Sequence, residues 1–481
     1  MNFQQFSKIQ LLNKCQELGI TKCKSNTKTK LIQILNDKLI SIQKSNYPII
    51  ENNFIENNFV ENNFIEKEEK EENTNMDIFI NNINDMDISD LSKYTFIDLF
   101  CGIGGFHQAL TKMGAKCVLA CDIDKDCRTV YKNNYNMEPV TNIKNINEKT
   151  MPDFDILCGG FPCQSFSNGG NKKCFNDDRG LLFDEIIRIA KEKKPRFMFL
   201  ENVKHILKVS KGLVLEYIKN KIASINYTLQ IFKISPHNFG IPQQRERVYF
   251  VCVRNDFYNG TKIQLPIYTG KIEFNQFLDK KENLDNKYFI KDDILNVLTV
   301  WDEIIKQFKV GEKISPTIMI NYAFNHSYSL SDFNSFPTWK QDYITKNKPL
   351  IEKYKEQFDK WYHTNSTILQ KKEIFGKLEW QAGIILNKDT IFNHFIQIRQ
   401  SGIRVKKANY FPTLVAISQI PIYGKEKRYI TPRECARLQS FPESFILLDD
   451  DKKSYKQLGN SVNVDNVFTV INSTFHNYIK K

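Results

Sequence analysis

One cysteine of this chain stands in a setting that favours reactivity over burial. Cys163 lies in the stretch "LCGGFPCQSFSNGG", between a proline and a glutamine, soon after the apolar run "FDIL". Most free cysteines are buried and inert, but a loop of Gly, Pro, Gln, Ser and Asn has little bulk with which to bury a thiol. Nearby cations or helix dipoles favour the nucleophilic thiolate. We therefore expect Cys163 to be an exposed nucleophile at the end of a strand.

Two further stretches supply a carboxyl group and two cations. "FMFLENV" ends an apolar run with Glu201, and burial at such a position raises the pKa of a carboxyl group, so that it can donate a proton. "FGIPQQRERVYF" places Arg245 and Arg247 two residues apart on one face of a strand, where they can grip a carboxylate and a carbonyl oxygen together. The alternatives are a solvated glutamate that caps a helix and ordinary surface charges.

A glycine-rich loop, "DLFCGIGGF", follows one apolar run and opens a helix, so its backbone can approach a ligand at the helix N-terminus. The dinucleotide fingerprint G-x-G-x-x-G fails here, because His107 takes the place of its last glycine. Asp122 in "CDID" can bind both hydroxyls of a ribose, and Asp155 is a further candidate near an adenine. A nucleoside cofactor without a pyrophosphate fits better than NAD, and S-adenosylmethionine is the obvious one.

The elements that must position these groups alternate regularly from Tyr94 onward. "YTFIDLF", "KCVLAC", "FDILC" and "RFMFLENV" are each followed by a helical pattern, which predicts an α/β fold with a parallel sheet covered by helices. "YTLQIFKIS" and "RVYFVCVRN" have no helix between them and predict an antiparallel pair at one edge of the sheet. From about 255 to 400 the rhythm ends, and aromatic and lysine-rich sequence predicts a smaller, irregular second domain.

Composition narrows the class of protein. The chain has 481 residues, 41% of them hydrophobic, which is enough for two or three domains. No apolar run reaches eighteen residues and the N-terminus lacks the apolar core of a secretory signal, so we expect a soluble, intracellular protein without membrane contact. Its 11 cysteines include no Cys-x-x-Cys pair, which favours reduced thiols and gives no reason to expect a metal site.

Charge is distributed unevenly along the chain. Residues 1–50 carry a net charge of +6, residues 51–90 carry −10, and residues 91–481 carry +17. A basic body joined to an acidic connector favours a polyanionic partner, nucleic acid first. A lysine-rich, solvated surface explains the charge alone equally well.

The N-terminal region has its own pattern. Ile9, Leu12 and Cys15 have helical spacing, and Thr27 or Thr29 can cap a second helix that carries Leu31, Ile32, Ile34, Leu35 and Leu39. The repeat "ENNFIENNFVENNFIE" has a five-residue period that matches neither a helix nor a strand, and we interpret it as a tether.

Six stretches together resemble one family, the C5-cytosine DNA methyltransferases: "FIDLFCGIGGF", "GGFPCQSFS", "ENV", "QQRERVYF", "TPRECARLQSFP" and "GNSV". The resemblance covers about 94–253 and again about 400–475, and "NINEKTMPDFDILCGGFPCQSFS" is similar to the bacterial restriction-modification members. It implies a Rossmann-like, S-adenosylmethionine-dependent fold with a mixed sheet, helices on both faces and a smaller target-recognition domain. "LLNKCQELGI…SNTKTKLIQIL" resembles a SAP-type DNA-binding module, with a plain helical hairpin as the alternative.

The resulting division of the chain has five parts. We expect a SAP-like module in 1–45, an acidic linker in 46–92, the catalytic and cofactor-binding domain in 93–260, the target-recognition domain in 261–425, and a C-terminal return that completes the catalytic domain in 426–481.

The resemblance also implies roles for individual residues. Cys163 is then the nucleophile that adds to C6 of a flipped-out cytosine, Glu201 the donor at N3, Arg247 the partner of the cytosine O2 and of Glu201, and Arg245 a support for the loop. The implied cofactor contacts are Asp98, Phe100, Gly102, Gly104, Asp122, Ile123, Asp155, Pro162, Asn460, Ser461 and Val462. Where some members have a tryptophan against the adenine, Ile123 offers packing but no π-stacking.

The implied substrate is a cytosine in a specific sequence of double-stranded DNA. The stretch "IRQSGIRVKKANYFPTLVA" resembles the end of the target-recognition domain, and the implied DNA contacts are Gln164, Ser167, Arg399, Arg404, Lys406 and Lys407. Which of these reads bases and which binds only the backbone stays open.

Two other functions compete with this one. The first is a tRNA-directed member of the same fold, although that branch usually has Pro-Pro-Cys-Gln and here Phe161 precedes Pro162. The second is a non-catalytic DNA-binding scaffold, which would be expected to lack one of the catalytic residues. We favour the DNA enzyme, acting as a monomer, and allow for a cognate restriction endonuclease as a partner.

Overall fold

The computed structural model describes residues 7–17, 27–32, 34–35, 54–57, 79–162, 181–314, 317–320, 330–416 and 419–479. Three residues expected at the active site, Cys163, Gln164 and Ser167, lie outside the described residues. The chain divides into two compact units, Met1–Ile55 and Glu56–Lys481, and each is described by itself.

The first unit contains helix α1 (Lys8–Glu17) and a second helical stretch over 28–32 and 34–35. Leu11, Cys15, Leu31 and Leu35 are buried against one another. Thr27 caps the second stretch, since its hydroxyl accepts a hydrogen bond from the backbone N–H of Lys30 at 3.3 Å. The expected position of Ile9 on the apolar face is wrong: its side chain is exposed and Leu11 is buried in its place. A paired helical arrangement fits a SAP-like module and a plain hairpin alike.

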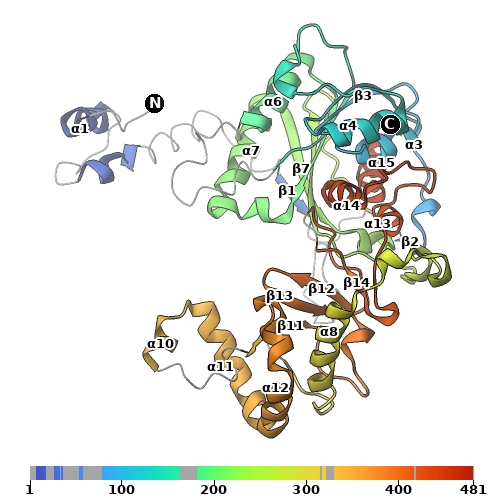
Figure 1. The fold of residues 1–481 in the computed structure, drawn as a ribbon. Helices are drawn as coiled ribbons and strands as arrows, with labels where there is room; N and C mark the ends of the chain where they lie inside the picture. The colour runs from blue at the N-terminus through green and yellow to red at the C-terminus, as the bar shows by residue number, and fades with distance from the viewer. Residues whose placement is uncertain are drawn as a thin grey trace. The chain divides into compact units, whose positions relative to one another are not determined.

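Six strands of the main sheet lie in the second unit, in the order β7-β8-β6-β5-β3-β4. Two of them, β7 and β3, are labelled in Figure 1. Strands β3 to β6 pair in parallel, whereas β8 pairs antiparallel with both β6 and β7. The expected antiparallel pair is therefore confirmed. The strands are β3 (Thr95–Leu99), β4 (Lys116–Cys121), β5 (Ile156–Gly160), β6 (Phe197–Val203), β7 (Tyr227–Ile234) and β8 (Arg247–Arg254).

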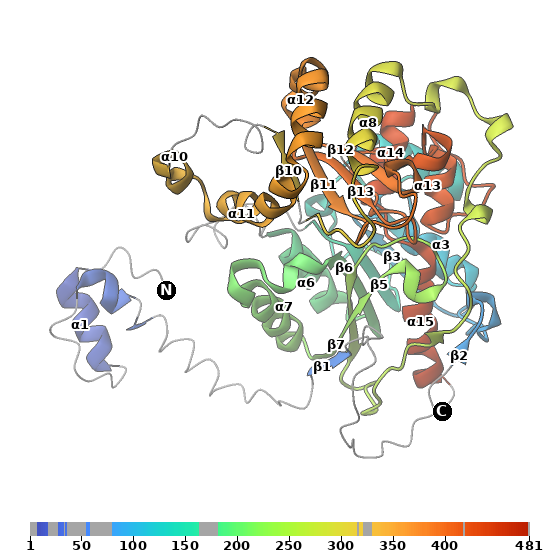
Figure 2. The same cartoon turned by 90° about the horizontal axis from the view of Figure 1, so that it is seen from below.

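Helices cover both faces of this sheet (Figure 2). On one face α6 (Leu181–Lys193) and α7 (Leu213–Ser224) share a core with inward residues of the strands such as Leu157 and Leu200. On the other face lie α3 (Gly105–Lys112), α4 (Lys125–Tyr135), α13 (Pro432–Leu438), α14 (Asp451–Asn460) and α15 (Val464–Ile479). Because both faces are buried, the strands consist mostly of apolar residues, which is why they could be predicted from the sequence.

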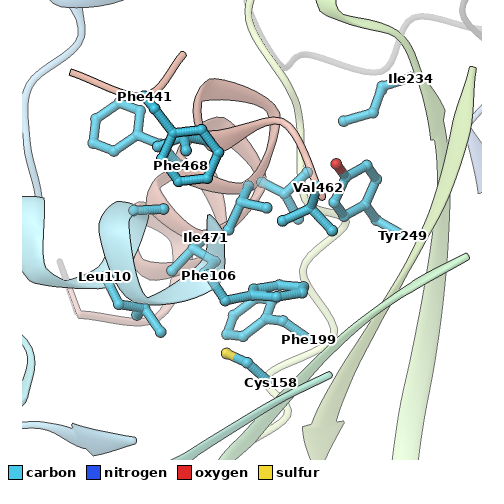
Figure 3. Packing of buried hydrophobic residues seen from close by; sticks show 14 of the residues in the cluster. Phe106, Leu110, Cys158, Phe199, Ile234, Tyr249, Phe441, Val462, Phe468 and Ile471 are labelled. Carbon is cyan, nitrogen blue, oxygen red and sulfur yellow. The ribbon is translucent and has the colours of Figure 1, made fainter. Parts of the chain in front are cut away.

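The C-terminal return is an integral part of the catalytic core. Helix α15 packs against α3, and Phe468 and Ile471 of α15 lie with Phe106 and Leu110 of α3 in one cluster (Figure 3). The expected return of the chain to the catalytic domain is thus seen directly in the packing.

Two short strands lie within the stretch expected to be the acidic linker. Strand β1 (Phe54–Asn57) lies across the boundary of the two units, and β2 (Phe79–Ile80) pairs in parallel with β9 (Ile267–Tyr268). Leu91 is fully buried, and Asn472 of α15 bonds to the backbone of Ser89 and Asp87. Residues 79–92 therefore pack on the catalytic unit, whereas the sequence placed them in a tether.

A second sheet follows in the region expected to recognise the target. Its order is β10-β11-β13-β12-β14-β15. The strands are β10 (Thr317–Met319), β11 (Lys377–Gln381), β12 (Phe395–Arg399), β13 (Gly402–Lys406), β14 (Ile422–Tyr423) and β15 (Arg428–Tyr429). The helices of this region are α8 (Asp292–Ile305), α10 (Leu330–Ser335), α11 (Thr338–Lys353) and α12 (Lys355–Gln370). The region is thus more regular than its sequence indicated.

One face of this second sheet packs on helices. Trp380, Ile403 and Val405 share a core with Trp301 of α8 and Trp361 of α12. Each of those helical tryptophans donates its indole N–H to a backbone carbonyl, which satisfies the polar atom inside an apolar core.

Short 3-10 helices connect these elements. They span Ile83–Asp85, Ile143–Asn145, Lys204–Leu207, Val209–Gly212, Pro236–Phe239, Asn275–Phe277, Lys281–Asn283, Asn286–Tyr288, Glu373–Gly376, Ile391–Asn393 and Gly424–Glu426. Over the described ranges, no helix is both long and apolar enough to pass through a bilayer.

Candidate active site

Glu201 and Arg247 form a buried ion pair between neighbouring strands. Glu201 is the fifth residue of β6, and Arg247 opens β8, which runs antiparallel to it. Arg247 Nε lies 3.0 Å from Glu201 Oε1, and their side chains are 13% and 11% exposed. Burial raises the pKa of Glu201, and the charges of Arg247 and Arg245 offset that rise only in part. The expected contact between these two residues is therefore present in the structure.

The second carboxylate oxygen of Glu201 faces a space kept open by a glycine. Gly160 stands opposite Glu201 in the pairing of β5 with β6, and a Cβ built on it would lie 3.8 Å from Glu201 Oε2. The same Cβ would lie 3.9 Å from a methyl group of Val462. The carboxyl group, the end of β5 and the C-terminal return thus meet at one point.

Asn202 fixes the chain just before the expected nucleophile. Its side chain is buried and donates a hydrogen bond of 2.8 Å to the carbonyl oxygen of Phe161. Its own side-chain oxygen accepts from the backbone N–H of Val203 at 2.9 Å. Because Phe161 and Pro162 immediately precede Cys163 in the chain, Asn202 anchors the entry to the cysteine loop.

Arg245 is a structural support and binds three backbone carbonyls. Its guanidinium donates to the carbonyl oxygens of Leu414, Gly459 and Ser461 at 2.6–2.9 Å. The residue is 1% exposed, and burial lowers the pKa of Arg245 to about 9. It therefore ties the strand that carries Arg247 to the C-terminal return and to Leu414.

The described cysteines of the second unit are poor nucleophiles. Burial raises the pKa of every one of these thiols: Cys101, Cys117, Cys121, Cys127, Cys158, Cys252 and Cys435. A raised pKa leaves little thiolate at neutral pH. In this unit the remaining candidates are Cys163 and Cys174, both outside the described residues.

The glycine loop after β3 is shaped by close contacts. Gly104 has a left-handed φ of +89°, and a Cβ there would lie 2.2 Å from the ring of Tyr135. A Cβ on Gly105 would lie 2.5 Å from a side-chain atom of Val462. Phe100 at the start of the loop also has a left-handed φ, of +55°, although it is not a glycine. The loop therefore closes tightly against α4 and the C-terminal return.

Acidic side chains stand at the ends of β3 and β4. The carboxylate of Asp122 accepts from the backbone N–H of Gly102 and of Asp124, each at 2.8 Å, and its oxygens keep lone pairs for further donors. Asp98 is fully buried, and its carboxylate oxygens have no well-aligned donor among the described residues. Burial and the charge of Asp122 raise the pKa of Asp98, and the His107 backbone N–H offsets this only in part.

The neighbouring Ile123 is 78% exposed, which is unusual for a large apolar side chain beside two carboxylates. The flat apolar ring of a ligand could pack on Ile123, and two hydroxyl groups of the same ligand could donate to the carboxylate of Asp122. The residues present thus fit a nucleoside cofactor. Ser461 lies against the glycine loop, since a Cβ on Gly105 would be 3.3 Å from its hydroxyl oxygen, whereas Asn460 is exposed on the return. Pro162 is half-buried and is the last described residue before Cys163.

The expected role of Asp155 is wrong. Its side chain accepts from the backbone N–H of Thr95 at 3.0 Å and lies 3.5 Å from Arg196. Thr95 begins β3, and Asp155 directly precedes β5, so this carboxylate stands at the edge of the sheet opposite the strand ends. The sequence missed a better placed residue: Val140 bridges Cys121, which brings Asn142 close to the end of β4.

His107, just after the glycine loop, packs among aromatic side chains of α4. His107 Nδ1 and the hydroxyl of Tyr131 are 2.7 Å apart, and the imidazole stacks on Tyr135 with ring centroids 3.8 Å apart. Burial lowers the pKa of His107 to about 4, so the ring is neutral at physiological pH. The residue that excluded a dinucleotide fingerprint is thus a core residue of α3.

Among the described residues, no cluster of three or more His, Cys, Asp and Glu side chains could hold a metal ion. The basic residues expected to contact DNA gather on the second sheet. Arg399 ends β12, Arg404 and Lys406 lie on β13, and Lys407 follows it and is exposed. The ammonium group of Lys406 contacts the side-chain oxygen of Gln244, the residue before Arg245, which links this sheet to the catalytic strands.

Comparison with known families decides the assignment. The model of the C-5 cytosine-specific DNA methylase family matches residues 94–476. The chain belongs to that family. This methylase is thus a DNA (cytosine-5-)-methyltransferase, as the motifs around Glu201 and Arg247 indicated.

Curated relatives of the methylase are Type II methyltransferases. M.HhaI of Haemophilus parahaemolyticus is 32% identical over 372 residues, which are 77% of this chain and 91% of that protein. M.BanI of Aneurinibacillus aneurinilyticus is 29% identical over 432 residues, 81% and 97% of the two chains. M1.ScrFI of Lactococcus lactis subsp. cremoris is 33% identical over 385 residues, 79% and 77% of the two chains.

Proposed function

We propose that this methylase transfers a methyl group from S-adenosylmethionine to C5 of a cytosine in a specific double-stranded DNA sequence, through a covalent bond between Cys163 and C6 of the base. The observation that carries the proposal is the buried pair of Glu201 and Arg247, 3.0 Å apart, beside the strand that leads into the cysteine loop. This arrangement supplies a proton donor and a cation where a cytosine ring must be activated.

The chemistry requires both groups. C5 of cytosine is a weak nucleophile, and addition of a thiolate to C6 converts the ring to an enamine whose C5 is reactive. The addition places negative charge on N3, where Glu201 donates a proton. Burial raises the pKa of Glu201, which favours the protonated form that can donate. Arg247 holds the carboxyl group and the cytosine O2. When C5 has been methylated, a base removes its proton and the thiolate leaves C6.

S-adenosylmethionine supplies an electrophilic methyl group on a sulfonium when bound. Residues at the ends of β3 and β4 would hold it: the backbone at Gly102 and Gly104, the carboxylate of Asp122, and the exposed face of Ile123. Val462 on the return closes over the glycine loop and reaches the side of Glu201.

The DNA must be deformed for this reaction. The target base is inside the stack, and flipping it out costs roughly a few kcal/mol. Residues 91–481 carry a net charge of +17, and phosphate contacts from such a surface offset that cost. The similarity to Type II methyltransferases supports a cognate restriction endonuclease that acts on the same site as a further partner.

The proposal is tested by expressing the full chain in cells that lack cytosine methylation and sequencing their DNA after bisulfite treatment. We expect 5-methylcytosine at one short sequence, and none with Cys163→Ser. Methylation of tRNA in place of DNA would assign the chain to RNA. Methylation that persists in Cys163→Ser would remove the covalent mechanism.

A further inference from the structure

The second sheet has a polar face that the proposed chemistry does not use. Along β11 and β13 the side chains alternate: Leu378, Trp380, Ile403 and Val405 are buried on the helices, and the residues between them point the other way. Glu379 stands directly opposite Arg404 in the pairing of these strands. Gln397 of β12 stands opposite Arg404 on its other side. Three polar side chains therefore form one row across the sheet.

Arg404 is held in a fixed orientation within this row. Its Nε lies 3.0 Å from Glu379 Oε2 and its Nη2 lies 3.0 Å from Glu379 Oε1, so the pair is bidentate. Arg399 Nη1 lies 3.8 Å from Glu379 Oε2, and its Nε donates to the side chain of Gln419 at 3.2 Å. The side chains of Arg399, Arg404 and Glu379 are 17–28% exposed, so a ligand can reach them from the solvent.

The bonds to Glu379 occupy only one edge of the Arg404 guanidinium. That edge uses the Nε proton and one proton of Nη2, which leaves both protons of Nη1 and the second proton of Nη2 on the outer edge. No acceptor among the described residues occupies this outer edge. Two N–H groups that point the same way in one plane match two adjacent acceptors, and in a DNA major groove guanine O6 and N7 are such a pair.

The row of Glu379, Arg404 and Gln397 lies near the stretch that leads to Arg245 and Arg247. Lys406 lies two residues beyond Arg404 on the same face of β13, a separation of roughly 7 Å along a strand. Its ammonium group contacts Gln244, which precedes Arg245. Phe395, opposite Lys406, packs on Phe411, and the carbonyl of Phe411 accepts from the backbone N–H of Gln244. The face that carries Arg404 is therefore joined to the stretch that leads to Arg247, the partner of Glu201.

We propose that Arg404, positioned by Glu379, reads one guanine of the recognition sequence through its O6 and N7 atoms. Arg404 is the specificity-determining residue and Glu379 a positioning residue that fixes which edge of the guanidinium meets the base. This inference rests on the proposed function, because it requires that the chain methylates DNA. A phosphate would also accept from the outer edge of Arg404, but phosphate contacts carry no base preference.

The first experiment uses the full-length protein and a randomised duplex library read by bisulfite sequencing. The wild type should methylate cytosine in one sequence that contains a required guanine. Arg404→Lys should lose the preference at that guanine while it keeps the preference at other positions, because a lysine cannot present two fixed donors. Glu379→Gln should weaken the preference at the same guanine. The matched control, Arg196→Lys, lies at the far edge of the catalytic sheet and should leave the preference unchanged.

The second experiment has a first arm that uses only the wild type, so that the outcome of this arm does not depend on the folding of a variant. Replacing the required guanine by 7-deazaguanine removes N7 but preserves base pairing, and it should slow methylation roughly tenfold or more. Arg404→Lys should respond less than twofold to this base.

If the wild type methylates a fixed sequence and no guanine in it responds to the 7-deaza change, the assignment of Arg404 is overturned and a phosphate contact takes its place. Full sequence preference in Arg404→Lys would overturn it in the same way. If the wild type methylates no DNA at all, the proposed function itself fails, and the inference falls with it.

Discussion

The two sheets of the second unit place their polar groups in opposite ways. The main sheet is buried on both faces, and its functional side chains stand at strand ends, where Glu201 and Arg247 are fixed by each other and by burial. The second sheet packs one face on helices, and part of its other face, which we call the open face, carries a row of partly exposed charged side chains: Glu379, Arg399 and Arg404. A strand end holds a single side chain in place for one step of a reaction. An open sheet face instead presents several long side chains, which can contact an extended partner such as a DNA duplex.

This difference separates two kinds of substitution. Changes at the strand ends of the main sheet should alter the rate of methyl transfer and leave the choice of sequence intact. Changes on the open face should alter the choice of sequence and leave the rate on the best site nearly intact. The following predictions sharpen that contrast, from the largest expected effect to the smallest.

Glu201→Gln should slow the chemical step by more than tenfold, because glutamine can donate a hydrogen bond to N3 but cannot deliver a proton. Single-turnover methylation of a short duplex measures this rate, and the affinity for the duplex is measured separately. The control Glu246→Gln removes an exposed carboxylate near Arg247 that pairs with Lys204, and it should leave the rate unchanged. A Glu201→Gln variant impaired only in DNA binding would contradict the role of Glu201 as donor.

Arg245→Met should lower the free energy of unfolding by about 3 kcal/mol, since it leaves the carbonyls of Leu414, Gly459 and Ser461 buried without their donor. Arg404→Met on the open face should lower it by less than about 1 kcal/mol, because its ion pair is partly exposed. Denaturant unfolding of the two variants measures the difference. Equal losses of unfolding free energy would contradict the expectation that the buried Arg245 stabilises the fold more than the partly exposed Arg404 does.

His107 should make stability depend on pH in mildly acidic solution. Its pKa falls from 6.5 in the unfolded chain to about 4 in the fold, so the stabilisation is fully present above pH 6.5 and is lost as the pH falls toward 4. The shift corresponds to roughly 3 kcal/mol. His107→Gln should flatten this part of the pH profile, and His205→Gln, at an exposed site, should leave its slope as in the wild type. A profile unchanged by His107→Gln would show that other groups set it.

The same contrast explains what the sequence could predict. Strands buried on both faces appear as apolar runs, and their ends coincide with unusual loops. The parallel strands, the antiparallel pair and the positions of Glu201 and Arg247 could therefore be predicted, but the order of the strands in the sheet could not. The second sheet could not, because its strands β10 and β11 are far apart in the sequence and β13 alternates polar and apolar residues. Its row of Glu379, Arg404 and Gln397 exists only after three strands are aligned.

The error over Asp155 has a physical origin. Two aspartates flank a phenylalanine in "PDFDIL", and a carboxylate near a strand can stand at either end of it. Asp155 precedes β5 and binds the start of β3. It therefore lies at the amino end of the strand, away from the cysteine loop at the carboxyl end, although it is close to that loop in the sequence. Asp122 follows β4, and it was predicted correctly to stand at the carboxyl edge.

The central claim is that a sulfur atom of Cys163 bonds to the target base, and one measurement tests it most directly. A duplex that carries 5-fluorocytosine at the methylated position is mixed with the full-length protein and S-adenosylmethionine, and the product is denatured and analysed by peptide mass spectrometry. Because fluorine cannot be removed as a proton is, the adduct should persist, with the DNA joined to the peptide that contains Cys163. Adduct formation at Cys174, or the absence of any adduct on a duplex that the protein methylates in its normal form, would contradict the account.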